Sequence, residues 1–286
     1  MGLVVERMRV VLFGAGGVGR RLFDLLSEED EVEVIAFVDN DPDKHGSVYR
    51  KIPIFAPKKL KDLNFQKLYY ATQMGIGELE EKLKQLGVSK TEIDKTYVET
   101  ISQARALSLQ RSAELVTKGS AQGAVAEAGV YRGEFARQIN RIFPERKFYL
   151  FDTFAGFDER DIPFEDKDSL VRASHFKETS VGRVKAKMSN INVCDFRKGF
   201  FPETTKGIND EFIFVSLDLD LYKPTYEGLL FFWPRMVSGG HIFIHDYFLP
   251  SYPNVAKAVS DFELALGTKV PKCPIGDDLS LALIKP

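Results

Sequence analysis

Length, composition and charge exclude several classes of protein. The chain has 286 residues, of which 44% are hydrophobic, and its formal net charge at pH 7 is −2. This length suggests two domains, and the small net charge gives no electrostatic reason to bind nucleic acid or an anionic membrane. No apolar run reaches the roughly 18 residues of a membrane span. With only two cysteines and no secretory leader pattern at its start, the chain is expected in the reducing cytoplasm.

Strand and helix patterns alternate over the first hundred residues, which predicts a small α/β domain at 1–100. Apolar runs at Met8–Phe13 and Val32–Val38 are typical of buried parallel strands, and the residues between them have helical spacing as far as Leu26. Later strands, helices and apolar stretches are expected at Lys67–Ala71, Gly77–Leu86 and Tyr97–Val98. The length leaves room for one half of a dinucleotide-binding fold, not for two.

A glycine-rich loop joins the first strand to the first helix. It has the pattern Gly-x-Gly-x-x-Gly at Gly14, Gly16 and Gly19, and Asp39 follows the second strand. In dinucleotide-binding domains these glycines make the turn, admit a pyrophosphate and pack the helix on the strand, while the acid binds ribose hydroxyls. The region up to about residue 75 resembles the small nucleotide-sugar or CoA-binding domains of sugar-modifying enzymes. The alternative is a domain that has lost its ligand and serves for dimerisation or docking.

A second, larger α/β domain is predicted at 101–286. Its pattern begins with a helix at Ser102–Thr117. The stretch Ala124–Ala136 then reads as a strand, a glycine-containing turn and a helix, and the next strand is expected at Phe148–Phe151. Together with the first domain, this predicts two Rossmann-like domains in one chain.

Two acidic residues mark this part of the second domain, and one of them takes the place of a glycine of the dinucleotide-binding motif. Glu127 takes the place of the first glycine, and Asp152 ends the following strand. Because Glu127 would repel a pyrophosphate and attract a cation, the pattern favours S-adenosylmethionine. Glu127 would lie near the ammonium end, Gly129 would allow close backbone approach, and Asp152 would bind the ribose. The alternative is a structural turn followed by a helix cap.

Two later apolar runs end in polar pairs, Asp218 with Asp220 and His245 with Asp246. The carboxyl ends of parallel strands line the ligand crevice, and the period of two puts Asp218 and Asp220 on one strand face. If the two strands are neighbours, three carboxylates and an imidazole converge, which suits a divalent cation with a base beside it. The alternative is that each aspartate caps a following turn or helix.

Four ordered motifs in this domain resemble the macrocin O-methyltransferase family, which methylates sugar hydroxyls of macrolides and related hydroxyls in aminocoumarin biosynthesis. The motifs are Ala126–Gly133, Asp152–Phe157, Leu217–Thr225 and Pro234–Gly240. The resemblance covers about residues 105–265. It implies a class I methyltransferase fold, S-adenosylmethionine as the donor and a magnesium ion that orients the acceptor hydroxyl.

Matched motif by motif, the resemblance implies a metal site at Asp218 and Asp246 with His245 as a further ligand, and a general base at Asp220. The roles of Asp218 and Asp220 could be exchanged. The family usually has a second acid where this chain has His245, which implies weaker metal binding, manganese or another transition ion, or a histidine base. The residues expected around the cofactor are Glu127, Gly129, Val130, Tyr131, Gly133, Asp152, Thr153, Phe154, Lys198, Gly199 and Asp218.

The segment from Phe157 to Ser189 is rich in charged and aromatic side chains and looks like a lid over the acceptor. Arg172 or Arg183 could hold a phosphate of a nucleotide-linked sugar, and a solvated helix or loop face is the alternative for each.

The sequence therefore predicts a metal-assisted O-methyltransferase that acts on a hydroxyl of a sugar or of a glycosylated or nucleotide-linked intermediate. A nicotinamide-dependent sugar oxidoreductase, using Gly14–Gly19 and Asp39, is opposed by the short first domain and by the lack of a Tyr-x-x-x-Lys pair. A nucleotide-binding scaffold with a degenerate methyltransferase domain is supported only by His245. Whether the chain forms a homo-oligomer is left open.

Overall fold

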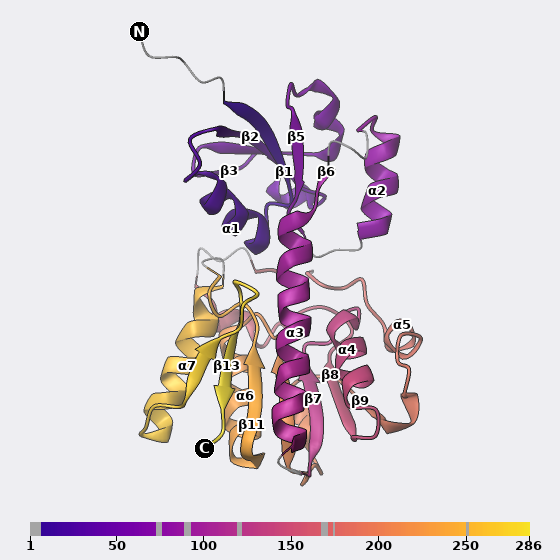
Figure 1. Ribbon diagram of the computed structural model, residues 1–286, viewed down its shortest axis with the longest axis vertical. Coiled ribbons are helices and arrows are strands. Elements are labelled where there is room, and N and C mark those ends of the chain that lie inside the picture. Colours follow the sequence, from indigo (N-terminus) through magenta and orange to yellow (C-terminus); the bar gives the residue numbers. More distant parts are fainter. Residues whose placement is uncertain are drawn as a thin grey trace. The chain divides into compact units, whose positions relative to one another are not determined.

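The computed structural model describes residues 7–72, 76–88, 93–118, 122–166, 171–173, 175–249 and 252–286. The chain divides into two compact units, one up to Ser102 together with Leu249, the other comprising Gln103–Phe248 and Tyr252–Pro286 (Figure 1). Within the described ranges, no helix is both long and apolar enough to cross a membrane.

The described part of the first unit is built around a six-stranded sheet with the order β3-β4-β2-β1-β5-β6. Its elements are β1 (Met8–Phe13), α1 (Gly17–Leu26), β2 (Val32–Val38), β3 (Val48–Tyr49), β4 (Ile52–Phe55), β5 (Lys67–Tyr70), α2 (Ile76–Gln85) and β6 (Ile93–Asp94). Strand β1 is parallel to β2 on one side and to β5 on the other. The sheet therefore extends past the single half of a dinucleotide-binding fold that the length of this unit suggests.

Both faces of this sheet are covered, which explains why β1 is apolar from Val10 to Phe13. Val10 and Leu12 pack in a core with α1. Val11 and Phe13 point the other way, into a core that includes Leu79 and Leu83 of α2. Alternate side chains of one strand thus enter two different cores, as the period of two requires.

A seven-stranded sheet with the order β12-β13-β11-β10-β7-β8-β9 forms the centre of the second unit. Its strands are β7 (Ala124–Ala128), β8 (Phe148–Asp152), β9 (Cys194–Lys198), β10 (Phe212–Leu217), β11 (Met236–Ile244), β12 (Lys272–Pro274) and β13 (Leu281–Ile284). Its helices are α3 (Thr96–Lys118), whose residues up to Ser102 belong to the first unit, α4 (Glu134–Ile142), α5 (Val181–Lys185), α6 (Tyr222–Phe232) and α7 (Pro253–Leu266). The predicted α/β fold class with two Rossmann-like sheets is confirmed. Helix α3 begins earlier than predicted and takes in the apolar stretch at Tyr97.

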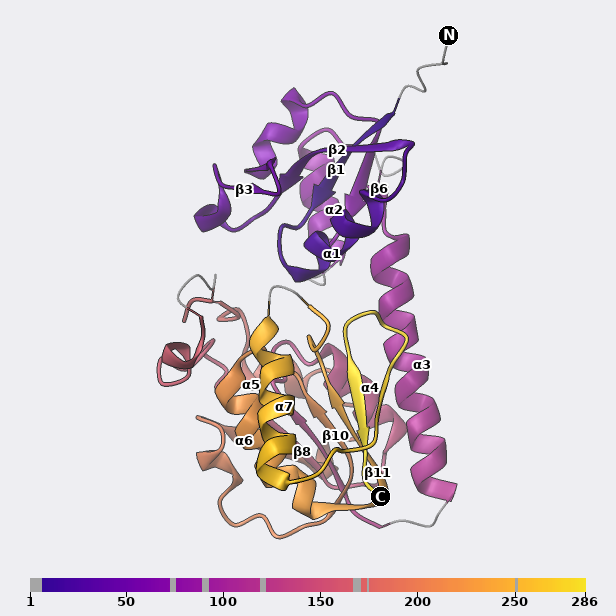
Figure 2. The ribbon, with the colours of Figure 1, turned by 90° about the vertical axis from the view of Figure 1, so that its left-hand side faces the viewer.

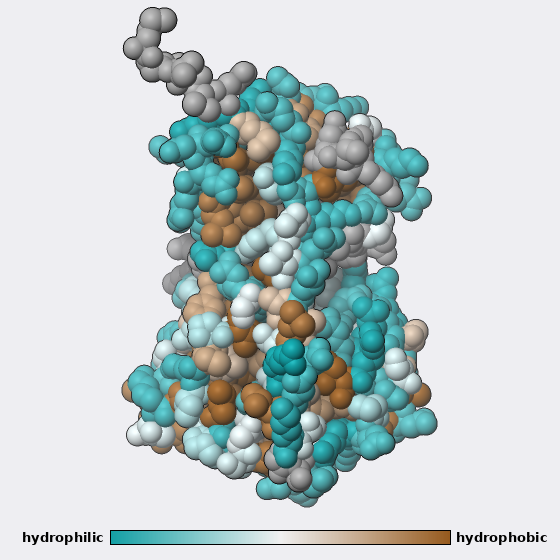
Figure 3. Space-filling model, in the orientation of Figure 1, coloured by the Kyte–Doolittle hydropathy of each residue, from teal (hydrophilic) through white to brown (hydrophobic). Residues whose placement is uncertain are grey.

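Helices cover both faces of this second sheet (Figure 2). Helices α6 and α7 pack on one face through residues such as Phe232 and Val259. On the other face, α3 and α4 pack through Leu109 and Ile139. The outer side of α3 is largely hydrophilic along its lower half, with hydrophobic side chains on either side (Figure 3), so this helix has one face for the core and one for solvent.

The strand order of this sheet locates its switch point. Strands β8 and β9 lie on one side of β7, whereas β10 and β11 lie on the other, so the chain changes direction between β7 and β10. Leu217 of β10 pairs with Ala128 of β7 and with Ile244 of β11. All three strands are parallel and end level with one another, which brings the residues that follow them together at the switch point, where α/β sheets bind ligands.

Candidate active site

Backbone hydrogen bonds carry the strand alignment one residue past the strand ends. The amide of Asp218 donates to the carbonyl of Ala128 at 2.8 Å, and the amide of His245 donates to the carbonyl of Leu217 at 2.9 Å. The sheet therefore fixes the backbone of Asp218 and His245, and Asp246 follows directly on His245.

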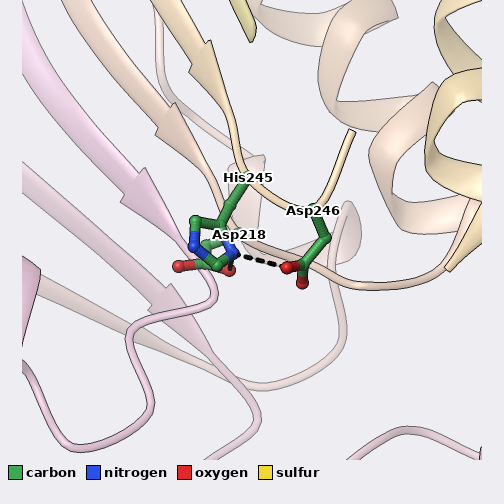
Figure 4. Close-up of side chains that lie close together, drawn as sticks. All are labelled: Asp218, His245 and Asp246. Carbon is green, nitrogen blue, oxygen red and sulfur yellow. Dashed lines mark ion pairs between the residues drawn. The ribbon is translucent and has the colours of Figure 1, made fainter. Parts of the chain in front are cut away.

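Asp218, His245 and Asp246 form a compact cluster (Figure 4). Nδ1 of His245 lies 2.9 Å from Oδ1 of Asp246 and 3.1 Å from Oδ1 of Asp218. One ligand atom from each residue lies within 4.8 Å of the others. Nε2 of His245 is buried and has no hydrogen-bond partner among the described residues.

The charges in this cluster are strongly coupled. Burial alone would lower the pKa of His245, but the carboxylates of Asp218 and Asp246 outweigh it and raise that pKa to about 10. Burial would raise the pKa of Asp218, yet the positive charges of His245 and Arg105 hold it well below its usual range. The two carboxylates thus favour the protonated imidazole, and a cation bound by the same three residues would displace that proton.

Asp220 reaches the same cluster by a different route from the one predicted. Strand β10 ends at Leu217, so strand alternation does not apply to Asp218 and Asp220. Asp220 instead has a left-handed backbone, with φ of 59°, and its carboxyl shares a hydrogen bond with Asp246. Burial, followed by the negative charge and hydrogen bond of Asp246, raises the pKa of Asp220 well above its usual value.

Arg105 of α3 is a member of the site that motif reasoning missed. Its Nη1 and Nη2 atoms lie 3.2 and 3.1 Å from Oδ2 of Asp218, and its guanidinium carbon lies 3.9 Å from the centre of the Phe135 ring. A signal for it exists in the sequence. Arg105 comes one helical turn before Leu109, which places a charged residue on the face of α3 that enters the core.

Glu127 is the second-to-last residue of β7, and its side chain is almost fully buried. Its Oε2 atom has no hydrogen-bond partner among the described residues. Burial raises its pKa well above the usual value, and the positive charge of Arg105 opposes that change. Glu127 thus faces the same group of charges as Asp218.

Asp152, at the end of β8, organises the loops on the other side of the switch point. Its carboxylate accepts the backbone amides of Tyr131 at 2.7 Å and Phe154 at 2.6 Å. Its carbonyl accepts the amide of Gly199 at 3.0 Å. Burial raises the pKa of Asp152, and these backbone hydrogen bonds act against that shift. Three of the loops expected around a cofactor are therefore joined at one residue.

Gly129 has a packing role that the sequence did not predict. Its φ is +87°, and a Cβ atom there would lie 1.7 Å from the carbonyl oxygen of Asp218. The space beside Gly129 is filled by the neighbouring loop. Its lack of a side chain is thus required by the packing of the β7 and β10 loops, and the close backbone approach of a cofactor at Gly129 stays a prediction.

The other residues expected around the cofactor lie in different surroundings. Val130 is buried in the core with α4, and Gly133 begins α4 with φ of +78°. The hydroxyl of Thr153 accepts the amide of Ala155 at 3.1 Å, which closes the turn after β8. Lys198 is the exposed last residue of β9.

Part of the predicted lid is joined to the site. Glu165 accepts the amide of Tyr222, the first residue of α6, at 2.7 Å, and it accepts a hydrogen bond from Asn254 at 2.9 Å. Arg183 donates to the carbonyl of Glu178, and Arg172 donates to its neighbour's carbonyl, so both guanidinium groups have partners in their own segment. Residues 167–170 and 174 of this segment lie outside the described residues.

The glycine-rich loop of the first unit has the local geometry of its motif. A Cβ atom on Gly19 would lie 1.9 Å from the carbonyl oxygen of Gly14, whereas one on Gly16 would meet nothing within 4 Å. The carboxylate of Asp39 accepts the amide of Ala15 at 2.8 Å and binds Lys44 at 3.0 Å. Asp39 is therefore already engaged within the protein.

Comparison with known proteins places the second unit, together with part of the first, in one family. The family model described as macrocin-O-methyltransferase matches residues 45–277, well over half of the chain. The chain belongs to the macrocin-O-methyltransferase family. This confirms the resemblance seen in the four motifs. The match begins after the glycine-rich loop, so family membership does not account for Gly14–Gly19.

Two curated relatives and one solved structure are similar to the chain. The mycinamicin III 3''-O-methyltransferase of Micromonospora griseorubida is 28% identical over 166 residues, 53% of this chain and 65% of that enzyme. A tetracenomycin-C 4'-O-methyltransferase of Streptomyces olivaceus, named for a dimethoxyrhamnosyl acceptor, is 28% identical over 152 residues, 49% of this chain and 58% of that enzyme. The chain thus spans less than two thirds of either relative. The O-methyltransferase NovP shares the fold, with a TM-score of 0.55 and 21% identity over 64% of this chain and 79% of that one.

Proposed function

We propose that this protein is an S-adenosylmethionine-dependent O-methyltransferase that acts on a hydroxyl of a sugar or of a glycosylated or nucleotide-linked intermediate, with the help of a divalent cation. The observation that carries the proposal is the convergence of Asp218, His245 and Asp246 at the switch point of the sheet, in a chain of the macrocin-O-methyltransferase family.

The donor set fits a divalent cation. Two carboxylates and one imidazole place a ligand atom each within 4.8 Å of one another, and Nε2 of His245 is buried with no partner among the described residues. An imidazole beside carboxylates favours manganese or another transition ion over magnesium, because nitrogen is a softer ligand than oxygen. A bound cation would lower the pKa of a hydroxyl that it coordinates.

Different residues of the site would bind the cation and accept the proton. Asp218, His245 and Asp246 would hold the cation and with it the acceptor hydroxyl. Asp220 has its carboxyl beside Asp246 and would take the proton that the hydroxyl loses. Since each of these side chains follows closely on a strand end, the sheet would keep the hydroxyl oxygen aligned with the donor methyl group, and such alignment supplies a large part of the rate.

The cofactor would lie along the loops that Asp152 joins. This carboxylate accepts hydrogen bonds from two backbone amides, and its other lone pairs can accept hydrogen bonds from ribose hydroxyls. Glu127 and Asp218 would provide negative charge near the ammonium group and the sulfonium. One of the two relatives is named for an acceptor that carries a rhamnosyl group, and a sugar acceptor is proposed for this chain by that analogy.

Thermal shift and methyl transfer test the proposal. S-adenosylmethionine is expected to raise the melting temperature of the full chain, since a ligand that binds only the folded state stabilises it. With Mn²⁺ present, S-adenosylhomocysteine should form when glycosylated macrolides or nucleotide-linked deoxysugars are supplied. Full turnover in excess chelator would refute the metal role. A melting temperature that rises with NAD, and not with S-adenosylmethionine, would favour the oxidoreductase alternative.

For the first unit we propose a nucleotide-containing ligand, such as the nucleotide part of the acceptor, at Gly14–Gly19. The supporting observation is at Gly16, the residue before α1, whose backbone faces open space and which supplies no side-chain cap to the helix. Amides at such a helix start can bind a phosphate. The alternative, a unit without a ligand that serves for dimerisation or docking, predicts that no nucleotide binds there.

A further inference from the structure

Arg105 is a charged side chain of the second unit that is largely buried, and its burial needs an electrostatic explanation. It lies on the core-facing stripe of α3, and its side chain is only 12% exposed. Its guanidinium carbon lies over the ring of Phe135, 3.9 Å from the ring centre. Burying a guanidinium is costly unless it is paired, so its presence in place of an aliphatic residue points to a partner that needs it.

That partner is Asp218, whose two oxygens are used differently. Oδ2 receives both terminal nitrogens of Arg105, at 3.1 and 3.2 Å. Oδ1 lies 3.1 Å from Nδ1 of His245. Nη2 of Arg105 also lies 3.4 Å from the hydroxyl of Ser216. The guanidinium is thus fixed by a ring, a hydroxyl and a carboxylate oxygen.

We propose that Arg105 is a positioning residue that holds Oδ2 of Asp218, so that Oδ1 is presented to the cation site formed with His245 and Asp246. This inference rests on the proposed function, because it concerns the same metal site. Side chains that hydrogen-bond to the ligands of a metal orient those ligands and commonly change metal affinity by about 10- to 100-fold.

Removing Arg105 would change the affinity of the site for a cation in two opposite ways. Loss of a positive charge close to Asp218 would favour cation binding by Coulomb attraction. Loss of the two hydrogen bonds from Arg105 would leave Oδ2 without its donors, and the carboxylate would rotate toward another donor. If Arg105 positions Asp218, the second effect dominates and the affinity falls. If Arg105 only balances charge, the affinity rises.

The experiment measures Mn²⁺ binding to the full chain by electron paramagnetic resonance, without cofactor or acceptor. Arg105→Met keeps the stem that packs on Phe135 and removes every donor, and it is expected to bind Mn²⁺ about 10- to 100-fold more weakly than the wild type. Arg105→Lys keeps the positive charge but cannot donate two hydrogen bonds to Oδ2 from a rigid plane, so we expect an affinity for Mn²⁺ between those of the wild type and Arg105→Met. Arg111→Met is the matched control, because Arg111 lies on the same helix with its side chain 70% exposed.

Equal or tighter binding by Arg105→Met would overturn the inference while leaving the metal site in place. A wild type that binds no Mn²⁺ would overturn the metal role in the proposed function and this inference with it. Melting curves in chelator establish that each variant is folded. If Arg105→Met does not fold, Arg105→Lys decides, because wild-type affinity in that variant would show that charge alone is needed.

Discussion

Asp152 is the residue on which cofactor affinity is expected to depend most directly. Replacing it by alanine removes an acceptor for ribose hydroxyls and leaves the amides of Tyr131 and Phe154 without their partner. We expect Asp152→Ala to weaken S-adenosylmethionine binding by about 1–3 kcal/mol, the usual cost of unpaired buried polar groups. Calorimetry well below the melting temperature measures this, with the surface variant Asp261→Ala as a control. Unchanged affinity in Asp152→Ala would disprove the assignment.

Glu263 is a residue outside the site that determines how stability depends on pH. Its buried carboxylate accepts the amide of Val270 at 3.0 Å and pairs with Lys272 at 2.7 Å and Lys269 at 2.9 Å. Burial would raise its pKa, but these partners outweigh burial and lower it to about 2. Because the folded pKa lies below the unfolded value of about 4.3, the stabilisation is complete above that value and is lost as the pH falls toward 2.

We therefore expect Glu263→Gln to lower the free energy of unfolding at pH 7 by about 1–3 kcal/mol. The difference from the wild type should shrink as the pH falls below about 4.3, where the wild-type carboxylate begins to be protonated in the unfolded chain. Urea unfolding at pH 7 and at pH 3 measures both effects. A difference that is the same at the two pH values would contradict the role given to this carboxylate.

At the scale of elements, the contact between the β7 and β10 loops is the tightest feature of the site. An alanine at Gly129 would have to adopt φ of +87° and would place its Cβ 1.7 Å from the carbonyl oxygen of Asp218. We expect Gly129→Ala to destabilise the protein by about 2–5 kcal/mol, from left-handed strain and overpacking together.

The matched control for this prediction is Gly267, which follows α7 with φ of +72° and where an added Cβ atom would meet nothing within 4 Å. Gly267→Ala carries only the conformational strain, about 1–2 kcal/mol. Urea unfolding of both variants separates strain from collision. Equal losses of stability would mean that the loops can separate without cost, and that Gly129 does not fix the position of Asp218.

At the scale of the whole molecule, the open question is whether the first unit binds a ligand. Gly16 has an extended backbone, and its Cβ position is unobstructed, so Gly16→Val should leave the fold intact. We expect the valine to fill the phosphate position and to weaken nucleotide binding by about 10-fold or more, whereas methyl transfer to an acceptor without a nucleotide should not change. Calorimetry with UDP-sugars and NAD measures the affinity. If the wild type binds no nucleotide, or Gly16→Val binds like the wild type, the unit is a scaffold.

The sequence by itself determined the elements and the position of the polar residues at their ends. The strands at Met8–Phe13 and Val32–Val38 lie where their apolar runs predict, because a parallel strand that is covered on both faces is mostly apolar. Asp152, Asp218 and His245 could be recognised as strand-end residues for the same reason. The family could also be recognised, since its motifs are short and contiguous along the chain.

Only the tertiary structure decided which of these ends meet and what surrounds them. Arg105 contacts Asp218 across 113 residues of sequence, and Gly129 is required by a carbonyl group of another strand's loop. Asp220 reaches Asp246 through a left-handed backbone rather than through strand alternation. Local patterns reflect the burial of each segment, whereas these contacts depend on the lateral order of the strands. That order is set by how the whole sheet buries its two faces, and no single segment encodes it.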